Sequence, residues 1–147
     1  LLAEIARLKA EVAHLKAEND RLQSKLVSSL SRFTMRDNGS IIFDAKTGKE
    51  WLVGPDKDTN FAEAEAFIAS LGDGWRSPES GELREIYQPG VGTHNLDPVF
   101  EMMGWWVWVE PRDASSAFGF SFSLGFEGWG DRDNGDDTRV FAVRSGR

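Results

Sequence analysis

Residues 1–26 read LLAEIARLKAEVAHLKAENDRLQSKL, and apolar side chains recur in this stretch at alternating spacings of three and four residues. A heptad numbered from Ile5 has two core positions, a and d. Position a holds Ile5, Val12, Asn19 and Leu26, and position d holds Leu1, Leu8, Leu15 and Leu22. A period of 3.5 residues predicts helices that wind around each other in a left-handed coiled coil. We expect the a and d residues to form the contact between chains.

Charged residues beside this core favour a parallel arrangement. Glu4 and Glu11 occupy position g, and Lys9 and Lys16 occupy position e. In a parallel pair, each of these glutamates faces a lysine of the neighbouring chain. β-Branched residues at a with leucine at d favour two strands, and the asparagine at position a, Asn19, fixes the register of a dimer. We therefore predict a parallel homodimer, with a homotrimer as the alternative.

The heptads fade in the serine-rich residues 27–31, which predict the helix end or a short joint. We place a boundary between Arg32 and Phe33, with a stalk at residues 1–32 and one head domain at residues 33–147. The chain has 24 acidic and 17 basic residues; the stalk holds four and six of them, so the head holds 20 and 11, a net charge of −9. An acidic head disfavours nucleic acid and other polyanions as partners.

The chain has no cysteine and only two histidines. Disulfides, thiol catalysis and Cys-ligated zinc are therefore excluded. His14 falls at a solvated position of the stalk, so a Ser-His-Asp triad would need His94. His94 lies in the loop-like stretch 91–95, and we interpret it as a plain loop residue. We expect no enzymatic activity and no obligatory cofactor.

The sequence contains neither an apolar run of about 18 residues nor a signal-peptide pattern. We expect no direct membrane insertion of this fragment. The heptads run to residue 1, so we expect the stalk to be cut from a longer chain, with any signal or anchor outside it. A grafted oligomerisation helix is the alternative origin of so regular a repeat.

A hairpin and a helix are predicted at the start of the head. Residues 40–44 and 50–53 are strand-like and flank a turn with Gly48 at a positive-φ position. Asn60 and Glu63 form a capping-box pattern that opens a helix. The residues expected on its inner face are Phe61, Ala64, Ile68 and Leu71.

A second helix and three strands are predicted to follow. Ser77 and Pro78 favour a helix start, with the serine as N-cap. Residues 105–109 are rich in Trp and Val, residues 118–124 alternate Phe or Leu with Gly or Ser, and residues 138–143 suit a closing strand. This order predicts an α+β fold in which two helices pack on a twisted antiparallel sheet.

Three motifs of the head resemble those of a known family. They are Thr47-Gly48-Lys49-Glu50-Trp51, then Trp75-Arg76-Ser77-Pro78 with Glu82-Leu83, and the final Phe141-Ala142-Val143-Arg144. Through these motifs, residues 33–147 are similar to a bacterial domain family of unknown function, typified by the C-terminal domain of the Legionella collagen-like adhesin. The resemblance implies a C-type-lectin-like fold in a secreted or surface protein that binds or displays.

The chain departs from this family in two respects. Many members carry one cysteine in the first helix and another near the final Val-Arg, and this chain has neither. The adhesin binds polyanions, which suits an acidic head poorly. We therefore carry over the fold and not the ligand, and we expect Trp75 to act as an aromatic plug and Arg76 to hold loop carbonyls.

Aromatic residues of the last strands are candidates for ligand binding. Trp106 and Trp129 are predicted to stack on a sugar ring, with polar partners nearby. The predicted polar partners are Glu110, Arg112 and Asp131. The alternative is that most of the tryptophans belong to the core.

A calcium site is a further hypothesis for the stretch Gly130-Asp131-Arg132-Asp133-Asn134-Gly135-Asp136-Asp137. Calcium takes six to eight oxygen ligands, and alternating carboxylates in a short loop supply several of them. The predicted ligands are Asp131, Asp133 and Asp136, although the spacing does not match an EF-hand. The alternative interpretation is a solvated turn between strands.

The sequence therefore predicts a bacterial extracytoplasmic or surface module. In this interpretation, a coiled coil presents lectin-like heads that bind a glycan or a protein, because joined heads bind with avidity. The alternative is a structural protein whose heads bind each other or a protein partner, without a small-molecule ligand.

Overall fold

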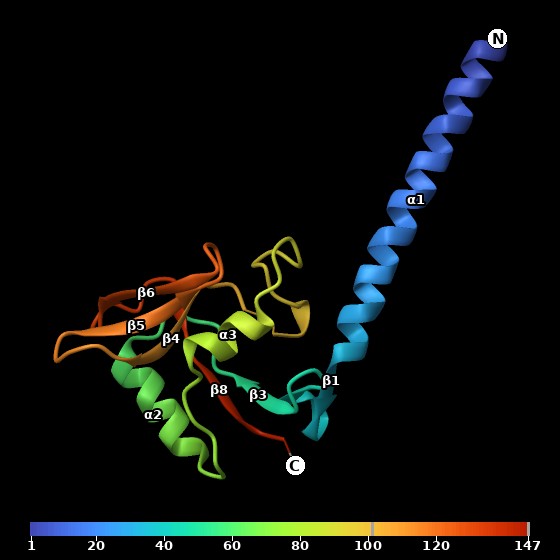
Figure 1. Cartoon of the computed structure of the whole chain (residues 1–147). Coiled ribbons are helices and arrows are strands. Elements are labelled where there is room, and N and C mark those ends of the chain that lie inside the picture. Colours follow the sequence, from blue (N-terminus) through green and yellow to red (C-terminus); the bar gives the residue numbers. More distant parts are fainter. Residues whose placement is uncertain (101, 147) are drawn as a thin grey trace.

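The computed structural model describes the backbone of residues 1–100 and 102–146, and their side chains except those of residues 24–31 and 38. Helix α1 (Leu2–Arg32) projects away from a head that contains all other elements (Figure 1). Its 31 residues correspond to a length of about 45 Å. The helix runs without a break through the serine-rich stretch and ends at the predicted boundary, because β1 begins at the next residue.

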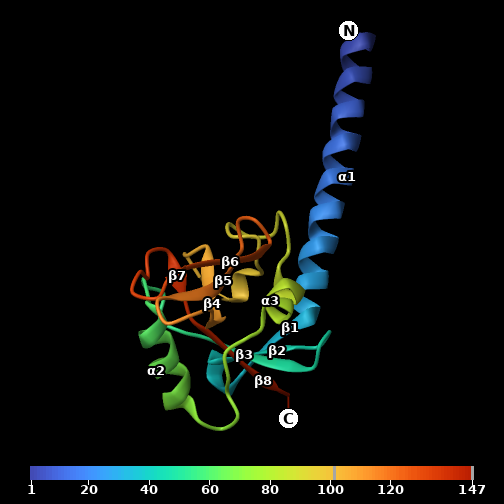
Figure 2. The same ribbon diagram turned by 60° about the vertical axis from the view of Figure 1, so that its left-hand side comes forward.

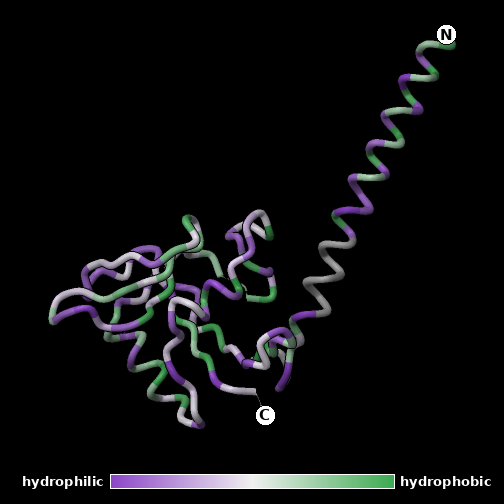
Figure 3. Tube along the Cα trace, viewed as in Figure 1, coloured by the Kyte–Doolittle hydropathy of each residue, from purple (hydrophilic) through white to green (hydrophobic). Residues whose placement is uncertain are grey.

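The core positions of α1 face solvent in the single chain. The exposed fractions are 41% for Ile5, 50% for Leu8, 52% for Val12, 65% for Leu15 and 52% for Leu22. Asn19 is exposed as well, and the side chain of Leu26 lies outside the described residues. Figure 3 shows apolar and polar residues alternating along the first part of this helix. No helix in the described part of the chain combines the length and the apolar character needed to cross a membrane.

The head contains two four-stranded sheets. The first has the order β1-β2-β3-β8 and the second has the order β6-β5-β4-β7. The strands of the first sheet are β1 (Phe33–Arg36), β2 (Ile41–Asp44), β3 (Lys49–Val53) and β8 (Phe141–Ser145). Those of the second are β4 (Trp106–Pro111), β5 (Ser116–Ser121), β6 (Phe126–Asp131) and β7 (Thr138–Arg139). The α+β class is therefore as predicted, but the single antiparallel sheet is replaced by two.

The positions of some strands were predicted correctly from local sequence patterns, and those of others were not. The β2–β3 hairpin forms as predicted, with Gly48 at φ 74°. The strand predicted at 118–124 ends at Ser121, because the Gly125 N–H bonds the Ser121 carbonyl at 2.7 Å and closes a turn. Leu124, which the alternation placed on one face with the phenylalanines, is consequently 57% exposed. Strand β7 pairs with β4 in parallel, contrary to the antiparallel prediction, and the sequence did not indicate β1 or β6.

Helix α2 (Phe61–Leu71) has the predicted capping box. The Glu63 N–H donates to Asn60 Oδ1 at 2.9 Å, and the Asn60 N–H donates to Glu63 Oε1 at 3.0 Å. Of the residues expected on the inner face of α2, Phe61 and Ala64 are buried, whereas Ile68 and Leu71 are only partly covered.

Helix α3 (Ser80–Ile86) begins later than predicted, with Glu79 as its N-cap. Ser77 does not cap it, because its hydroxyl donates to the Val109 carbonyl of β4 at 2.6 Å.

The two helices pack on opposite faces of the second sheet. Leu83 of α3 belongs to the main core, which includes the buried ring of Phe120 from β5. Phe61 of α2 belongs to a second core with Trp108 and Ala117 of the same sheet. Figure 2 shows α2 and α3 on opposite sides of the head. The cavity described below lies on the face of the second sheet that α2 covers in part.

An ion pair joins the two charged residues of the motif that begins at Trp75. The Arg76 guanidinium donates to both carboxylate oxygens of Glu82, at 2.6 and 2.8 Å. Lys49 Nζ lies 3.2 Å from the same carboxylate, which is 7% exposed. Arg76 was expected to hold loop carbonyls, but its only carbonyl partner among the described residues is that of Ser77, at 3.3 Å. Trp75 is half-buried beneath the Arg144 guanidinium, 4.2 Å from its ring centroid.

The ion pair predicts an acid-sensitive contribution to stability. Burial raises the pKa of Glu82, but hydrogen bonds from Arg76, the Glu79 N–H and Lys49 outweigh it and lower this pKa from 4.5 to about 2. Because the folded-state pKa is depressed, the contribution is complete above pH 4.5 and is lost as pH falls towards 2. We expect Glu82→Gln to remove about 2 kcal/mol of the difference in unfolding free energy between pH 7 and pH 2, allowing for the half-exposed arginine.

Urea denaturation at the two pH values measures this difference. Glu65→Gln is the matched control, because Glu65 is exposed on α2 and makes no ion pair among the described residues. Equal pH dependence in the native chain and Glu82→Gln would contradict the assignment to Glu82.

Candidate ligand-binding site

A cavity of about 180 Å³ opens on the α2 face of the second sheet. Its lining comes from three strands and from the loop between β6 and β7: Trp106, Trp108, Gly119, Trp129, Gly130, Asp131, Asn134, Asp136 and Thr138. Three of the five predicted ligand-binding residues, Trp106, Trp129 and Asp131, belong to this lining. Pockets for drug-sized ligands usually measure about 300–1,000 Å³, so the volume suits one small group.

Two glycines form a flat seat for the Trp106 indole. Gly119 of β5 and Gly128 of β6 are directly opposite each other across the strand pair. A Cβ at Gly128 would lie 3.0 Å from Cη2 and 3.1 Å from Cζ3 of Trp106, and a Cβ at Gly119 would lie 3.4 Å from Cε3. The edge of the six-membered ring formed by Cε3, Cζ3 and Cη2 therefore lies over both glycines. Trp106 is half-buried, whereas its neighbour in the lining, Trp108, is only 5% exposed.

The two indole N–H groups differ in their partners. The Trp108 N–H donates to the Thr59 carbonyl at 2.7 Å and so fastens β4 to the segment before α2. The Trp106 N–H has no hydrogen-bond partner among the described residues. Trp106 thus offers a ligand both an aromatic face and a donor at its edge.

The loop between β6 and β7 supplies a polar rim. The Asp133 N–H donates to Asp131 Oδ1 at 2.8 Å, and the Asp136 N–H donates to Asn134 Oδ1 at 2.9 Å. The carboxylate of Asp136 is exposed and makes no ion pair among the described residues. Two successive turns therefore shape the rim and leave carboxylate oxygens available.

Contacts with the segment before α2 hold this loop in place. Gly135 packs so closely that a Cβ there would lie 2.5 Å from the Thr59 carbonyl carbon. The Asp137 N–H donates to Asp58 Oδ1 at 3.1 Å, and the guanidinium of Arg139 bonds Asp56 and Asp58 at 2.8 and 3.1 Å. Arg139 is 8% exposed, and no signal in the sequence distinguished it. These contacts therefore fix the position of the rim relative to the segment before α2.

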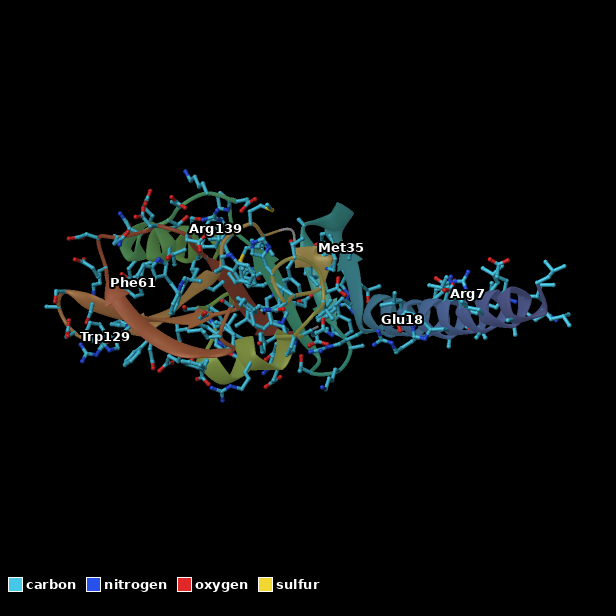
Figure 4. The ribbon with its side chains drawn as sticks, turned by 90° about the horizontal axis from the view of Figure 1, so that it is seen from above. Arg7, Glu18, Met35, Phe61, Trp129 and Arg139 are labelled. Carbon is cyan, nitrogen blue, oxygen red and sulfur yellow. The ribbon has the colours of Figure 1, made fainter. Side chains whose placement is uncertain are left out.

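The structure does not bring Trp129 and Trp106 together as one stacking surface. Trp129 is opposite Phe118 in the β5–β6 register, and side chains alternate between faces along a strand. Because Gly128 faces Trp106, the Trp129 indole points to the other side of the sheet, although the residue belongs to the cavity lining. Figure 4 shows Phe61 of α2 and Trp129 on opposite sides of the strands.

Two predicted polar partners also lie apart from the cavity. The Arg112 guanidinium covers the Trp129 ring at 4.1 Å from the centroid and pairs with Asp113 at 3.0 Å. Glu110 is exposed near the end of β4 and does not line the cavity. Asp131 is thus the only one of the three predicted polar partners in the lining.

The predicted calcium ligands do not gather. Within residues 1–100 and 102–146, no group of three or more His, Cys, Asp or Glu side chains is placed to hold a metal ion. The site predicted from Asp131, Asp133 and Asp136 therefore has no counterpart there. The physical reason is local, since Asp131 closes a turn and Asp133 does not belong to the cavity lining.

His94 lies in a loop, as predicted, and its side chain is packed against its neighbours. It is 8% exposed, its ring centroid lies 4.4 Å from that of Trp105, and its Nδ1 is 2.9 Å from the Thr93 hydroxyl. It borders a second cavity of about 580 Å³ that also includes Asp56 and Met102. Hydrogen bonds from Arg139 and the Met103 N–H lower the pKa of Asp56, which keeps this carboxylate charged.

Comparisons of the chain with protein-family models, with curated proteins and with solved structures found no match. We therefore infer the function from the cavity and from the exposed apolar row of α1.

Proposed function

We propose that this chain is an oligomeric, non-enzymatic binding module in which a parallel coiled coil presents two heads to a glycan or protein ligand. The observation that carries the proposal is the row of exposed a and d side chains on α1, a helix that projects from the head (Figure 1). Most of the stability of a helix in a protein comes from the packing of its apolar face. Pairing two such helices removes the row from water and stabilises both.

The head is proposed to have a C-type-lectin-like fold. Two features support this proposal. The C-terminal strand β8 pairs with β3, so both ends of the head lie in one sheet, and two helices accompany a second sheet. The Arg76–Glu82 ion pair also gives the motif that carries the family resemblance a structural role. The location of the protein at a bacterial surface or in an extracytoplasmic compartment rests on that resemblance.

The small cavity gives each head a modest contact area, so joining heads matters. Once one head is bound, the second binds from a high effective concentration, and avidity exceeds single-site affinity by about 10²–10⁴. A stalk of about 45 Å separates the heads from whatever precedes the helix. These two properties suit adhesion to a surface that carries many copies of the ligand.

A binding screen that compares the oligomer with a variant unable to associate through the stalk tests this proposal. The intact chain and a Leu8→Asp/Leu15→Asp variant are applied to arrays of immobilised glycans and matrix proteins, in calcium and in EDTA. We expect retention of the intact chain to exceed that of the variant by at least about tenfold on densely coated spots. Equal retention, or no retention on any spot, would contradict a multivalent binding module.

Exposed apolar side chains on the head favour an assembly role as a second candidate. Leu124 and Phe126, beside the β5–β6 turn, are 57% and 54% exposed. If heads associate through this turn, the Leu8→Asp/Leu15→Asp variant should remain oligomeric and a further Phe126→Ser change should dissociate it. Sedimentation of these two variants distinguishes association through the heads from association through the stalk.

A further inference from the structure

We infer that the Trp106 cavity binds a saccharide that carries no negative charge, with a protonated amino sugar, such as a glucosamine unit, as its preferred ligand. This inference deepens the proposed binding function and rests on it. It depends on the seat of the indole, on the hydrogen-bonding groups around the indole, and on the charge of the lining.

The seated indole is suited to a flat, partly apolar ring. The six-membered ring of Trp106 packs over the Gly119–Gly128 pair, and neither glycine has a side chain that would displace the indole from the cavity. A pyranose presents a face of C–H groups, and packing this face on an aromatic ring removes apolar surface from water. The cavity volume of about 180 Å³ matches a single ring of this kind.

Polar groups around the indole match the hydroxyls of such a ring. The Trp106 N–H is a donor without a partner among the described residues. Asn134 has a side-chain NH₂ group, and the carboxylate of Asp136 accepts hydrogen bonds. Donors and acceptors thus occur at one edge of an apolar face, which is the arrangement that fixes the orientation of a ligand in a mostly apolar site.

The charge of the lining selects among saccharides. Asp131 and Asp136 belong to the lining, and no lysine or arginine does. The two arginines adjacent in sequence to lining residues have other partners, since Arg132 lies over Phe61 and Arg139 bonds Asp56 and Asp58. A sulfate or uronate would face unpaired carboxylates, whereas an ammonium group meets both the carboxylates and the negative face of the indole.

Titration of the full-length chain with three oligosaccharides of equal length tests the inference. Tryptophan fluorescence and calorimetry are recorded with glucosamine oligomers, at a pH where the amine is protonated, and with N-acetylglucosamine and glucuronate oligomers. We expect glucosamine to bind at least about fivefold more tightly than its neutral counterpart, and the anionic oligomer not to bind. Salt should reduce the difference between the first two ligands.

Four variants assign the site. Trp106→Ala should abolish binding, and Asp136→Asn should weaken the binding of glucosamine more than that of the neutral ligand. Met35→Ala is the control, because it removes an exposed apolar side chain of β1, outside the cavity lining, and should leave all affinities unchanged. Gly128→Ala, whose Cβ would crowd Cη2 of Trp106 at 3.0 Å, should weaken binding while the head stays folded by circular dichroism.

The outcomes separate this inference from the proposed function. Unchanged binding in Trp106→Ala, tightest binding of the anionic oligomer, or no binding of any of the three overturns the inference. If the intact chain nevertheless shows oligomer-dependent retention on another ligand, the multivalent module stands without it. If Trp106-dependent glucosamine binding occurs in a monomeric chain, the saccharide site stands and multivalent display fails.

Discussion

The Leu8→Asp/Leu15→Asp variant is expected to be monomeric at concentrations where the native chain is fully associated. In a parallel dimer, both leucines occupy d positions and pack into the facing helix. Four leucine side chains then leave the interface, each with a burial free energy of at least about 1.5 kcal/mol, so the dissociation constant should rise by about four orders of magnitude or more. The introduced carboxylates repel each other and add to this effect.

Sedimentation equilibrium measures the change and also distinguishes a dimer from a trimer in the native chain. Ala10→Asp/Ala17→Asp is the matched control, because both alanines lie at the outward position f and the variant adds the same charge to the same helix. The head should remain folded in both variants, since the mutated side chains are already exposed in the single chain. An oligomer that persists in the double variant would show that the apolar row is not the interface.

The Arg32→Met variant is expected to lose about 3 kcal/mol of unfolding free energy. Arg32 Nε and Nη2 donate to Asp44 at 2.8 and 2.9 Å, and Nη2 also donates to the Glu85 carbonyl at 2.8 Å. The side chain of Asp44 is completely buried, and that of Arg32 is 13% exposed. Removing the arginine would leave a buried carboxylate with only Thr47 and the Lys46 N–H as partners, and such a break typically costs about 3–5 kcal/mol.

Protonation of Asp44 explains why the effect should depend on pH. Burial alone raises the pKa of Asp44, but the hydrogen bonds from Arg32 and Thr47 and the charge of Arg32 lower it below its usual value. The contribution of the pair is therefore present at neutral pH and is lost as pH falls through the depressed pKa. The difference between native chain and variant should accordingly shrink in acid.

Thermal denaturation at pH 7 measures the loss as a decrease in Tm of about 10 °C. Lys46→Met is a matched control, because Lys46 is exposed in the same turn and only its backbone N–H contacts Asp44. Asp44→Asn combined with Arg32→Met should restore part of the stability, since the unpaired charge is then absent. A Tm for Arg32→Met equal to that of the Lys46→Met control would contradict this role.

The Arg32–Asp44 pair also orients the stalk. Arg32 is the last residue of α1, and Asp44 is the last residue of β2, so the pair joins the helix end to the first sheet. The Ala45 N–H donates to the Arg32 carbonyl at 2.9 Å, which adds a backbone contact at the same place. A stalk that was predicted as separate from the head therefore meets it through a buried ion pair that periodicity does not reveal.

Structural features that depend only on residues close together in the sequence could be predicted. The capping box of Asn60 and the positive φ of Gly48 depend on residues within three or four positions, and both occur as expected. The start of α3 was misplaced because Ser77 has a distant partner, the Val109 carbonyl, that competes with capping. Strand β7 was expected to be antiparallel, but it pairs in parallel with β4, a strand that is distant in the sequence. Pairing between distant segments was in each case the missing information.

The sequence by itself determined the long helix with its a and d row, the α+β class, and the presence of aromatic and acidic residues near the C-terminus. Tertiary structure alone decided which of those residues share a face. The Gly119–Gly128 pairing made room for the Trp106 ring on one face, and the Phe118–Trp129 pairing placed the second indole on the opposite side. The reason is that side chains alternate along a strand, so the face that a residue occupies depends on a register that only its partner strand specifies.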